Sequence, residues 1–399
     1  MLPEPPKYVQ NVLARLEARG FNAYLVGGCV RDLMIGRRPS DWDVCTSALP
    51  EEVMAAFPHT RPTGLQHGTV TVLTKVKPVE VTTFRADGKY LDHRRPESVR
   101  FLPDISGDLS RRDFTVNAMA LSRSGALIDL FGGRADLSQR LIRCVGEPDQ
   151  RFSEDALRMF RAFRFSAQLG FALEPETRAA ILRNAPLSGT LARERVSVEL
   201  EKTLLSPKPE TVADILAPGL LTGLADGSGA RKRDFICLQN APHNRTGRWC
   251  AFCALLLQKG MLQSAAQFLT DLRLDTASVK DASKGAELAR SGAPKDKTAW
   301  KRLLCENGEH ACRCCAAACD ALYGPGNTRR LTAALKSGEP WRLSDLSVNG
   351  ADLSALGLKG PAIGKVLHRL LLHVAEVPAD NKRSTLLALA GGMQSADSF

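Results

Sequence analysis

The chain has 399 residues, of which 54 are Lys or Arg and 43 are Asp or Glu, so its formal net charge is +11. This length suggests about two to four domains, and the positive charge favours a polyanionic partner such as nucleic acid or a nucleotide. No stretch is apolar for long enough to span a bilayer, and the first residues, MLPEPPKYVQ, lack the apolar core of a signal peptide. The composition therefore argues against a membrane protein and predicts a cytoplasmic one.

Eleven cysteines are present, an odd number. Five of them lie in the run CENGEHACRCCAAACD, where His310 could add a zinc ligand, but the run lacks the paired C-x-x-C spacing typical of zinc sites. Free thiols are expected in a reducing cytosol. The pattern thus favours structural cysteines, and a metal site around Cys312 is the open alternative.

The first part of the chain predicts a mixed sheet with helices. Apolar spacing over residues 8–18 indicates a helix that Gly20 ends, and FNAYLVGG indicates a buried strand that runs into a glycine turn. A helix follows through Leu33, and WDVCTS indicates a second strand beside the first. GTVTVLT and VEVTTF alternate like a pair of strands. These elements fill residues 1–145.

Beyond Gly146 the pattern becomes helical, with breaks rich in proline and glycine. The segment SEDALRMFRAFRFSAQLG predicts one helix with Ser153 as its N-cap and Gly170 at its end. Steps of three residues advance about 300° around a helix. We therefore expect one slowly drifting stripe of charged side chains, formed by Asp155, Arg158, Arg161 and Arg164.

A glycine turn and two aspartates suggest a phosphate and metal site. Gly27 and Gly28 allow the backbone to approach a ligand closely, and amides at the following helix N-terminus would suit a triphosphate. Asp41 and Asp43 flank Trp42 at the start of the second strand, where alternate residues point to the same side. Two carboxylates on one face can share Mg²⁺ ions, which require oxygen ligands. We therefore predict Mg²⁺ bound to Asp41 and Asp43.

Glu80, in VEVTTFR, offers a third carboxylate among apolar neighbours. A buried acid needs a partner, and a metal ion is one. Three carboxylates on adjacent strands would form the two-metal arrangement for nucleotidyl transfer, in which one ion activates a hydroxyl and the other steadies pyrophosphate. The alternatives are that Asp41 caps a turn and that Glu80 pairs with Arg85.

Asp155 and Arg158 can imitate the pairing edge of a base. A carboxylate accepts from an exocyclic amino group, and a guanidinium donates to a ring nitrogen or a carbonyl. Cytosine and adenine both carry an amino group beside a ring acceptor, whereas uracil and guanine present a carbonyl there. The pair would thus admit CTP and ATP and reject UTP and GTP. The alternative is a solvated, salt-bridged helix face.

The string LVGGCVRD…DWDV resembles the signature of the DNA polymerase β-type nucleotidyltransferase superfamily. DLSRRDFTVNAMA and RFSEDALRMFRAFRFSAQLGF are similar to motifs of the class II tRNA nucleotidyltransferase and bacterial poly(A) polymerase family, and the similarity ends at RERVSVELEK. The resemblance implies an α+β fold: a polymerase β-like head with a mixed sheet, then an all-α neck, body and tail. The implied domains are a catalytic head over 1–145, a base-recognising neck over 146–205, a body over 206–275 and a tRNA-binding tail over 276–399.

The resemblance also implies roles for single residues. Asp41 and Asp43 would hold the metal with Glu80 as a further catalytic carboxylate, Asp155 and Arg158 would form a protein template, and Asp32 would support the nucleotide site. Seven further residues would contact the sugar and phosphates of the nucleotide or support the template: Gly28, Arg31, Arg111, Arg112, Asp113, Arg161 and Arg164.

The implied activity is addition of C, C and A to the 3′ end of tRNA from CTP and ATP without a nucleic-acid template, with the acceptor and TΨC arms recognised by shape. The alternatives are a poly(A) polymerase, an enzyme that adds only A, and a non-catalytic RNA-binding protein. The segment DGKYLDHRRP, with Gly88, Asp92 and Arg94, resembles a mobile loop of CCA-adding enzymes and argues against an enzyme that stops after CC. Retention of Asp41 and Asp43 argues against a non-catalytic protein.

Overall fold

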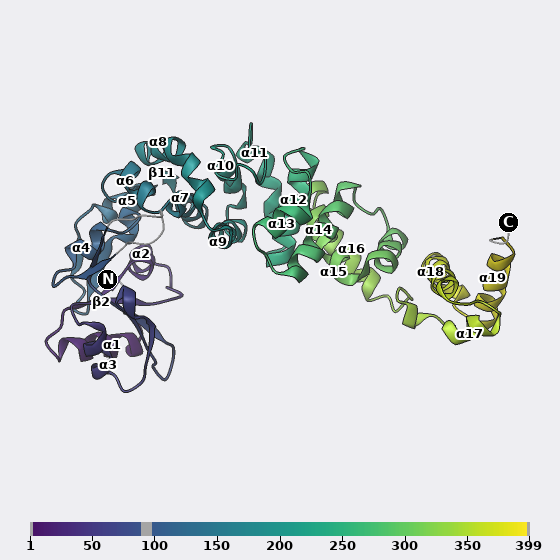
Figure 1. Ribbon diagram of the computed structural model, residues 1–399, viewed down its shortest axis with the longest axis horizontal. Coiled ribbons are helices and arrows are strands. Elements are labelled where there is room, and N and C mark those ends of the chain that lie inside the picture. The colour runs from purple at the N-terminus through teal and green to yellow at the C-terminus, as the bar shows by residue number, and fades with distance from the viewer. Residues whose placement is uncertain (1–2, 89–97, 397–399) are drawn as a thin grey trace. The chain divides into compact units, whose positions relative to one another are not determined.

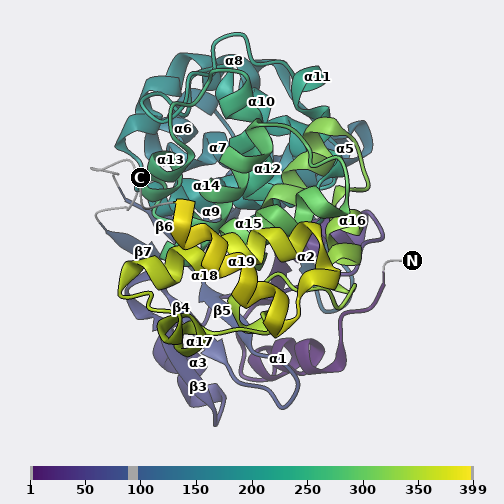
Figure 2. The same cartoon turned by 90° about the vertical axis from the view of Figure 1, so that its right-hand side faces the viewer.

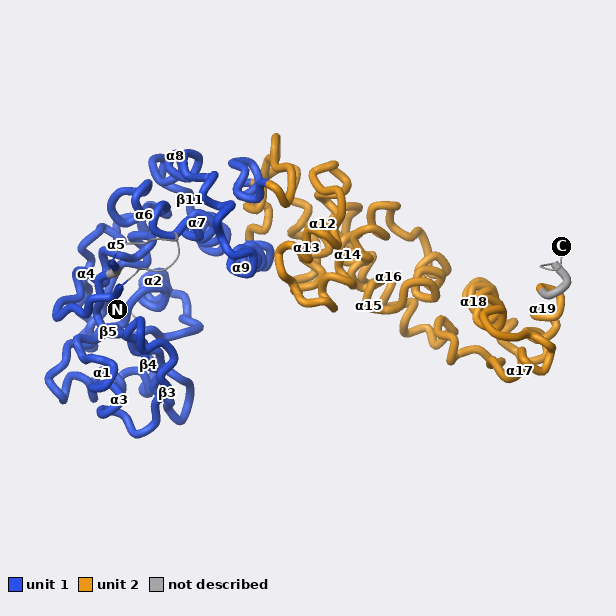
Figure 3. Tube along the Cα trace, viewed as in Figure 1, with its two compact units in different colours: residues 1–207, 214–222 blue, residues 208–213, 223–399 orange. Residues whose placement is uncertain are grey.

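The computed structural model describes residues 3–88 and 98–396. The chain divides into two compact units, Met1–Pro207 with Asp214–Thr222 and Lys208–Ala213 with Gly223–Phe399 (Figure 3). The finer division into head, neck, body and tail stays a prediction.

The first unit contains a mixed seven-stranded sheet, as the sequence predicted (Figure 1). β2 pairs in parallel with β5, and the other neighbouring strands are antiparallel. In spatial order the strands are β3 (Thr60–Gly64), β4 (Thr69–Val72), β5 (Val79–Thr83), β2 (Asp43–Thr46), β1 (Ala23–Val26), β8 (Met119–Ser122) and β9 (Leu127–Asp129). The four predicted strands β1, β2, β4 and β5 are therefore confirmed.

Helices in this part of the unit are short and amphipathic, and α1 buries the apolar side chains predicted for it, Val9, Val12, Leu13 and Leu16. They are α1 (Lys7–Glu17), α2 (Gly28–Met34), α3 (Pro50–Ala56), α4 (Ser106–Ser110) and α5 (Gly133–Gln139). α4 packs Ile105 and Leu109 against Val26 and Cys45 of the sheet. Because alternate residues of a strand share a face, Asp43 lies on the same face of the sheet as Cys45.

A separate hairpin joins β6 (Arg85–Asp87) to β7 (Val99–Phe101). The Gly88 amide donates to the Ser98 carbonyl at 2.8 Å, which extends the hairpin by one bond. Asp92 and Arg94, two residues of the loop identified in the sequence, lie outside the described residues.

The prediction of one helix from Ser153 to Gly170 is wrong. α6 (Pro148–Glu154) ends and α7 (Leu157–Leu169) begins on either side of Asp155, whose backbone is extended with φ −144° and ψ 101°. The Asp155 carboxylate accepts from the Leu157 amide at 3.1 Å and so replaces a helical bond with a local side-chain bond. Ser153 lies inside α6 and does not cap a helix. Gly170 ends α7 at a φ of 75°, as expected.

The rest of the first unit is mainly helical. α7 packs against α9, and β10 pairs in parallel with β11. The remaining elements are β10 (Leu141–Ile142), β11 (Ala172–Leu173), α8 (Pro175–Asn184), α9 (Arg193–Leu204) and α10 (Val212–Leu216).

The regular elements in the described residues of the second unit are all helices, as predicted. α12, α14, α15 and α16 pack together, while α17, α18 and α19 share a small core around Leu353, Leu370 and Leu386 (Figure 2). The helices are α11 (Lys232–Phe235), α12 (Arg245–Gln258), α13 (Ala265–Asp271), α14 (Thr276–Arg290), α15 (Lys297–Tyr323), α16 (Asn327–Leu335), α17 (Gly350–Ala355), α18 (Pro361–Glu376) and α19 (Arg383–Ala396).

All eleven cysteines are free thiols, and Cys312, Cys314, Cys315 and Cys319 are buried in α15. Over the described part of the chain, no three His, Cys, Asp or Glu side chains form a group that could hold a metal ion. Within the same part, no helix is both long and apolar enough to cross a membrane.

Candidate active site

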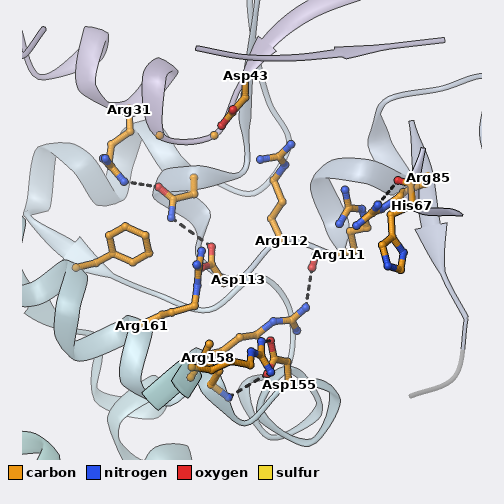
Figure 4. Close-up of a pocket in the computed structure, with 16 residues that line it drawn as sticks. Arg31, Asp43, His67, Arg85, Arg111, Arg112, Asp113, Asp155, Arg158 and Arg161 are labelled. Carbon is orange, nitrogen blue, oxygen red and sulfur yellow. Dashed lines mark hydrogen bonds and ion pairs between the residues drawn. The ribbon is translucent and has the colours of Figure 1, made fainter. Parts of the chain in front are cut away.

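A cavity of about 520 Å³ in the first unit gathers most of the residues predicted from the sequence (Figure 4). The predicted residues that line it are Gly28, Arg31, Asp43, Arg111, Arg112, Asp113, Asp155, Arg158 and Arg161. It is also lined by Gly27, by Arg85, and by five residues with no predicted contact, His67, Asn117, Leu157, Phe165 and Arg195. The predicted residues Asp41, Glu80 and Arg164 do not line it.

The glycine turn, Gly27 and Gly28, forms one wall of the cavity and lies close to Arg112. Gly27 has a φ of 74°, in the region that favours glycine, and it precedes the first residue of α2. A β-carbon at Gly27 would lie 2.9 Å from Arg112 Nη1. Glycine at position 27 therefore leaves room for the Arg112 guanidinium, which a larger residue would displace.

Asp43 brings a carboxylate to this wall from the start of β2. Its register partner across the parallel pair is Glu80 of β5. Desolvation raises the pKa of Asp43, the Glu80 charge raises it further, and Arg112 partly offsets the rise. Asp41 precedes the strand, accepts from the Ser40 hydroxyl at 3.0 Å and also raises the pKa of Asp43. Carboxylates therefore crowd together at the end of β2.

These residues fit a divalent metal ion. Carboxylate oxygens are the donors that hard divalent cations require. A cation beside Asp43 would also relieve the repulsion that raises its pKa. Glu80 does not join both aspartates in one three-carboxylate group, so its catalytic role stays a prediction.

Asp113 organises the side of the cavity next to α7. One oxygen accepts from the Phe114 amide at 2.9 Å and from Asn117 at 3.2 Å, and the other accepts from Arg161 Nε at 2.8 Å. Burial raises the pKa of Asp113, but Arg161 and the hydrogen bonds outweigh it and lower the pKa to about 2. Because these donors occupy both of its oxygens, Asp113 orients Asn117 and Arg161 at the cavity wall.

Arg31 is fixed from two directions. Its Nη1 donates to Asn117 Oδ1 at 2.7 Å, and its Nε and Nη2 donate to Asp32 Oδ1 at 2.9 and 2.8 Å. Its guanidinium lies 5.3 Å from the centre of the Phe165 ring, and that of Arg161 lies 5.4 Å from the same ring. Phe165 therefore serves as a common packing surface for two cavity arginines.

The two predicted template residues line the same cavity, but each is paired with another residue. Asp155 Oδ2 accepts from Arg195 Nη2 at 2.9 Å, so α9 supplies the partner of Asp155. Arg158 Nη1 donates to Glu154 Oε2 at 2.7 Å, and its Nη2 donates to the Arg111 carbonyl at 3.0 Å. Both side chains are thus held in place by ion pairs.

Arg164 lies elsewhere. It forms a buried ion pair with Glu199 of α9, donates to Gln168 at 2.9 Å and packs against Phe165. It lies in α7 about one turn beyond Arg161, where it is buried against Glu199 of α9. Its position suits support of the α7–α9 packing.

Five lining residues were not predicted from the sequence, namely His67, Asn117, Leu157, Phe165 and Arg195. Asn117 lies within DLSRRDFTVNAMA, so its place beside Asp113 in the motif was a signal. Arg195 lies in RERVSVELEK, 40 positions beyond Asp155, and no local pattern joins the two.

Two family models match parts of the chain. The poly A polymerase head domain matches residues 23–143, which include the sheet and the aspartates. The probable RNA and SrmB-binding site of polymerase A matches residues 170–224. Together with the fold, these matches indicate a nucleotidyltransferase head followed by an RNA-binding segment.

Curated relatives match the chain over nearly its whole length. The CCA-adding enzyme of Limosilactobacillus fermentum is 38% identical over 405 residues, covering 99% of each chain. That of Geobacillus kaustophilus is 39% identical over 403 residues, covering 96% of each. The crystal structure of the Bacillus stearothermophilus CCA-adding enzyme in complex with CTP matches with a TM-score of 0.82 and 34% identity over 99% of each chain. The chain therefore belongs to the CCA-adding enzyme family of tRNA nucleotidyltransferases, and membership implies a divalent metal ion.

Because Asp113 is paired with Arg161, we expect the free energy of unfolding to depend on pH. The folded-state pKa of about 2 lies below the ordinary value of an aspartate, so ionised Asp113 stabilises the fold by about 2 kcal/mol at neutral pH. This contribution is complete above about pH 4 and is lost as the pH falls through about 2. Urea unfolding at a series of pH values should therefore show an Asp113→Asn deficit that shrinks below about pH 4.

Asp149→Asn is the matched control, because Asp149 forms an exposed pair with Arg183 at 2.7 Å in the same unit. Its effect should be small and should disappear at high salt. An Asp113→Asn deficit that stays constant down to pH 2 would show that the carboxylate charge does not contribute.

Proposed function

We propose that this protein adds C, C and A to the 3′ end of tRNA from CTP and ATP and releases pyrophosphate, with the protein in place of a nucleic-acid template. The observation that carries the proposal is one cavity with Asp43 on the sheet wall and with Asp155 and Arg158 on the helical wall. A pure RNA-binding protein needs cations for phosphates but gains nothing from carboxylates at these positions.

The arginines of the cavity provide the phosphate site. Seven arginines and three aspartates are among its lining residues in the described chain. Arg112 lies beside Gly27 and points toward Asp43, whereas Arg111 lies on the side of Arg85 and His67 (Figure 4). A triphosphate between the two arginines would meet both the cations and the carboxylate of Asp43. Guanidinium groups suit this task because they donate several hydrogen bonds to phosphate oxygens in fixed geometry.

Asp41 and Asp43 would hold Mg²⁺, because their donors are carboxylate oxygens. When bound there in a pair, such ions lower the pKa of an attacking hydroxyl and stabilise the leaving pyrophosphate. The chain's own contribution is to hold the 5′ phosphates beside Arg111 and Arg112 in line with the tRNA 3′ hydroxyl.

Asp155 and Arg158 would select the base. The Asp155 carboxylate accepts a hydrogen bond from the amino group of cytosine or adenine, and a carbonyl at that position of uracil or guanine would face it unfavourably. Arg195 holds this carboxylate by a charge-assisted bond, which fixes its orientation at the cavity wall. Arg161 and Arg164 would support the template, and Gly28 and Arg31 would contact the nucleotide.

The RNA partner is tRNA, with its acceptor and TΨC arms recognised by shape. The helical second unit and its basic residues would provide the contacts, and the tail over 276–399 is the proposed binding domain. Eleven free cysteines fit a reducing compartment, and we propose that the protein acts in the cytoplasm.

The activity is tested by incubating the protein with tRNA that ends before CCA, with labelled CTP and ATP and Mg²⁺. Addition that stops after three nucleotides is the expected result. No incorporation would contradict the enzyme assignment, long A tails would indicate a poly(A) polymerase, and addition of A only to tRNA ending in CC would indicate an A-adding enzyme.

Base selection is tested with Asp155→Ala. Loss of one pairing group should lower the preference for CTP and ATP over UTP and GTP by at least about tenfold. Arg195→Met should act in the same direction with a smaller effect, because the carboxylate remains but is free to turn. Initial rates with each nucleotide measure the preference.

Two control variants separate selection from catalysis. Asp41→Ala should abolish transfer of every nucleotide, and Arg183→Gln, on the exposed face of α8, should leave both rate and preference unchanged. If Asp155→Ala kept full selectivity, the base-recognition role of Asp155 would be wrong.

A further inference from the structure

Asp108 does not line the cavity, yet it binds two arginines that do. It lies in α4 with no exposed surface. Its Oδ1 accepts from Arg111 Nε at 3.0 Å and Nη2 at 2.6 Å, and its Oδ2 accepts from Arg112 Nη2 at 2.9 Å. The Cys45 thiol lies 3.5 Å from the same Oδ2. One carboxylate thus connects α4, the sheet and the phosphate end of the cavity.

Asp108 is charged in spite of its burial. Desolvation raises the pKa of a buried carboxyl, but Arg112 and Arg111 outweigh this effect and leave the pKa of Asp108 below its ordinary value. A buried charge without partners would be very costly. The two arginines are therefore a condition for burying this carboxylate, and the carboxylate in turn restrains both arginines.

The arrangement leaves each arginine partly available to a ligand. The side chains of Arg111 and Arg112 are 20% and 18% exposed, and both line the cavity. Their two positive charges share one negative charge, so the group keeps a net charge of +1 toward the cavity. Without Asp108, two adjacent guanidiniums would repel each other and lose their common anchor.

The neighbouring contacts restrict the same two residues further. Arg112 lies against the glycine turn, where a Gly27 β-carbon would be 2.9 Å from its Nη1. The Arg111 carbonyl accepts from Arg158 Nη2 at 3.0 Å, which ties its backbone to α7. Side chain and backbone are therefore both fixed before a ligand arrives.

We propose that Asp108 is a positioning residue that holds Arg111 and Arg112 in the orientation needed to bind the triphosphate of CTP or ATP. The inference rests on the proposed function and adds a residue to it. A flexible arginine loses rotamer freedom when it binds phosphate, whereas a restrained one has already lost it during folding. Asp108 thus transfers the ordering cost from nucleotide binding to folding.

The charge of Asp108 alone would act in the opposite direction. Removing a negative charge near the cavity raises its positive potential and should tighten CTP binding. Loss of positioning should weaken it. The sign of the change in CTP affinity therefore separates the two effects.

The test compares CTP with CMP in binding to Asp108→Asn by calorimetry without tRNA. CTP should bind at least about tenfold more weakly than to the unmodified protein, as expected for the loss of a charged hydrogen-bond anchor. CMP, which lacks the outer two phosphates, should change by less than about twofold. An unchanged or tighter CTP affinity, or an equal loss for both nucleotides, would overturn the proposal.

Asp136→Asn is the matched control. Asp136 is also buried, at 5% exposure, and it binds Arg143 and the Thr115 hydroxyl in the same unit without lining the cavity. This variant should lower the melting temperature but leave the ratio of CMP to CTP dissociation constants unchanged. If this ratio fell as much in Asp136→Asn as in Asp108→Asn, Asp108 would contribute only to the stability of the fold, and the proposal would be wrong.

A measurement on the unmodified protein covers the case in which Asp108→Asn does not fold. The Nε–H groups of Arg111 and Arg112 should have the same high NMR order parameters with and without CTP. Arginines that are mobile without CTP and ordered with it would overturn the proposal. If the unmodified protein bound CTP no better than CMP and transferred no nucleotide, the proposed function itself would fail.

Discussion

The described part of the chain places seven arginine side chains around one cavity, and the fold depends on offsetting the repulsion between their charges. Carboxylates solve this problem by ion pairs from several elements. Asp108, in α4, restrains Arg111 and Arg112. Asp113, in the segment that follows α4, restrains Arg161. Because like charges at close range are costly in a partly desolvated site, these pairs must form when the protein folds. The sheet, the glycine turn and the helices position the residues of these ion pairs around the same cavity.

The same type of ion pair serves two tasks at the two ends of the cavity. At the end near β2, carboxylates orient arginines and leave cationic groups for phosphates. At the end formed by α7 and α9, the roles are reversed, because Arg195 orients Asp155 and leaves a carboxylate at the cavity wall. One end is therefore suited to a feature that all nucleotides share, and the other to the base that distinguishes them. We propose that one site accepts both CTP and ATP because both share the triphosphate and carry an amino group that would meet Asp155.

The sequence predicted the sheet and most residues of the recognised motifs, and it missed one local helix break and the partners that hold two cavity side chains in place. Strand alternation and the glycine turn indicated the mixed sheet, and motif resemblance indicated Asp43, Asp155 and most cavity arginines. The break between α6 and α7 was missed because helix propensity continues across it, and a single bond from the Asp155 side chain ends the helix. The partner Arg195 was missed because it lies on α9, 40 positions from Asp155, and no local pattern joins the two. Asp108 stands three and four positions before Arg111 and Arg112, a helical spacing that is visible in the sequence, but its burial depends on how α4 packs against the sheet.

We infer that the protein itself, through Asp155, presents the group that recognises the base. A crystal structure of the protein with CTP, and a second with ATP, would test it most directly. We expect the amino group of each base within hydrogen-bond distance of the Asp155 carboxylate and the phosphates beside Arg111 and Arg112. A base bound away from Asp155 in either complex, with the carboxylate still paired only to Arg195, would contradict it.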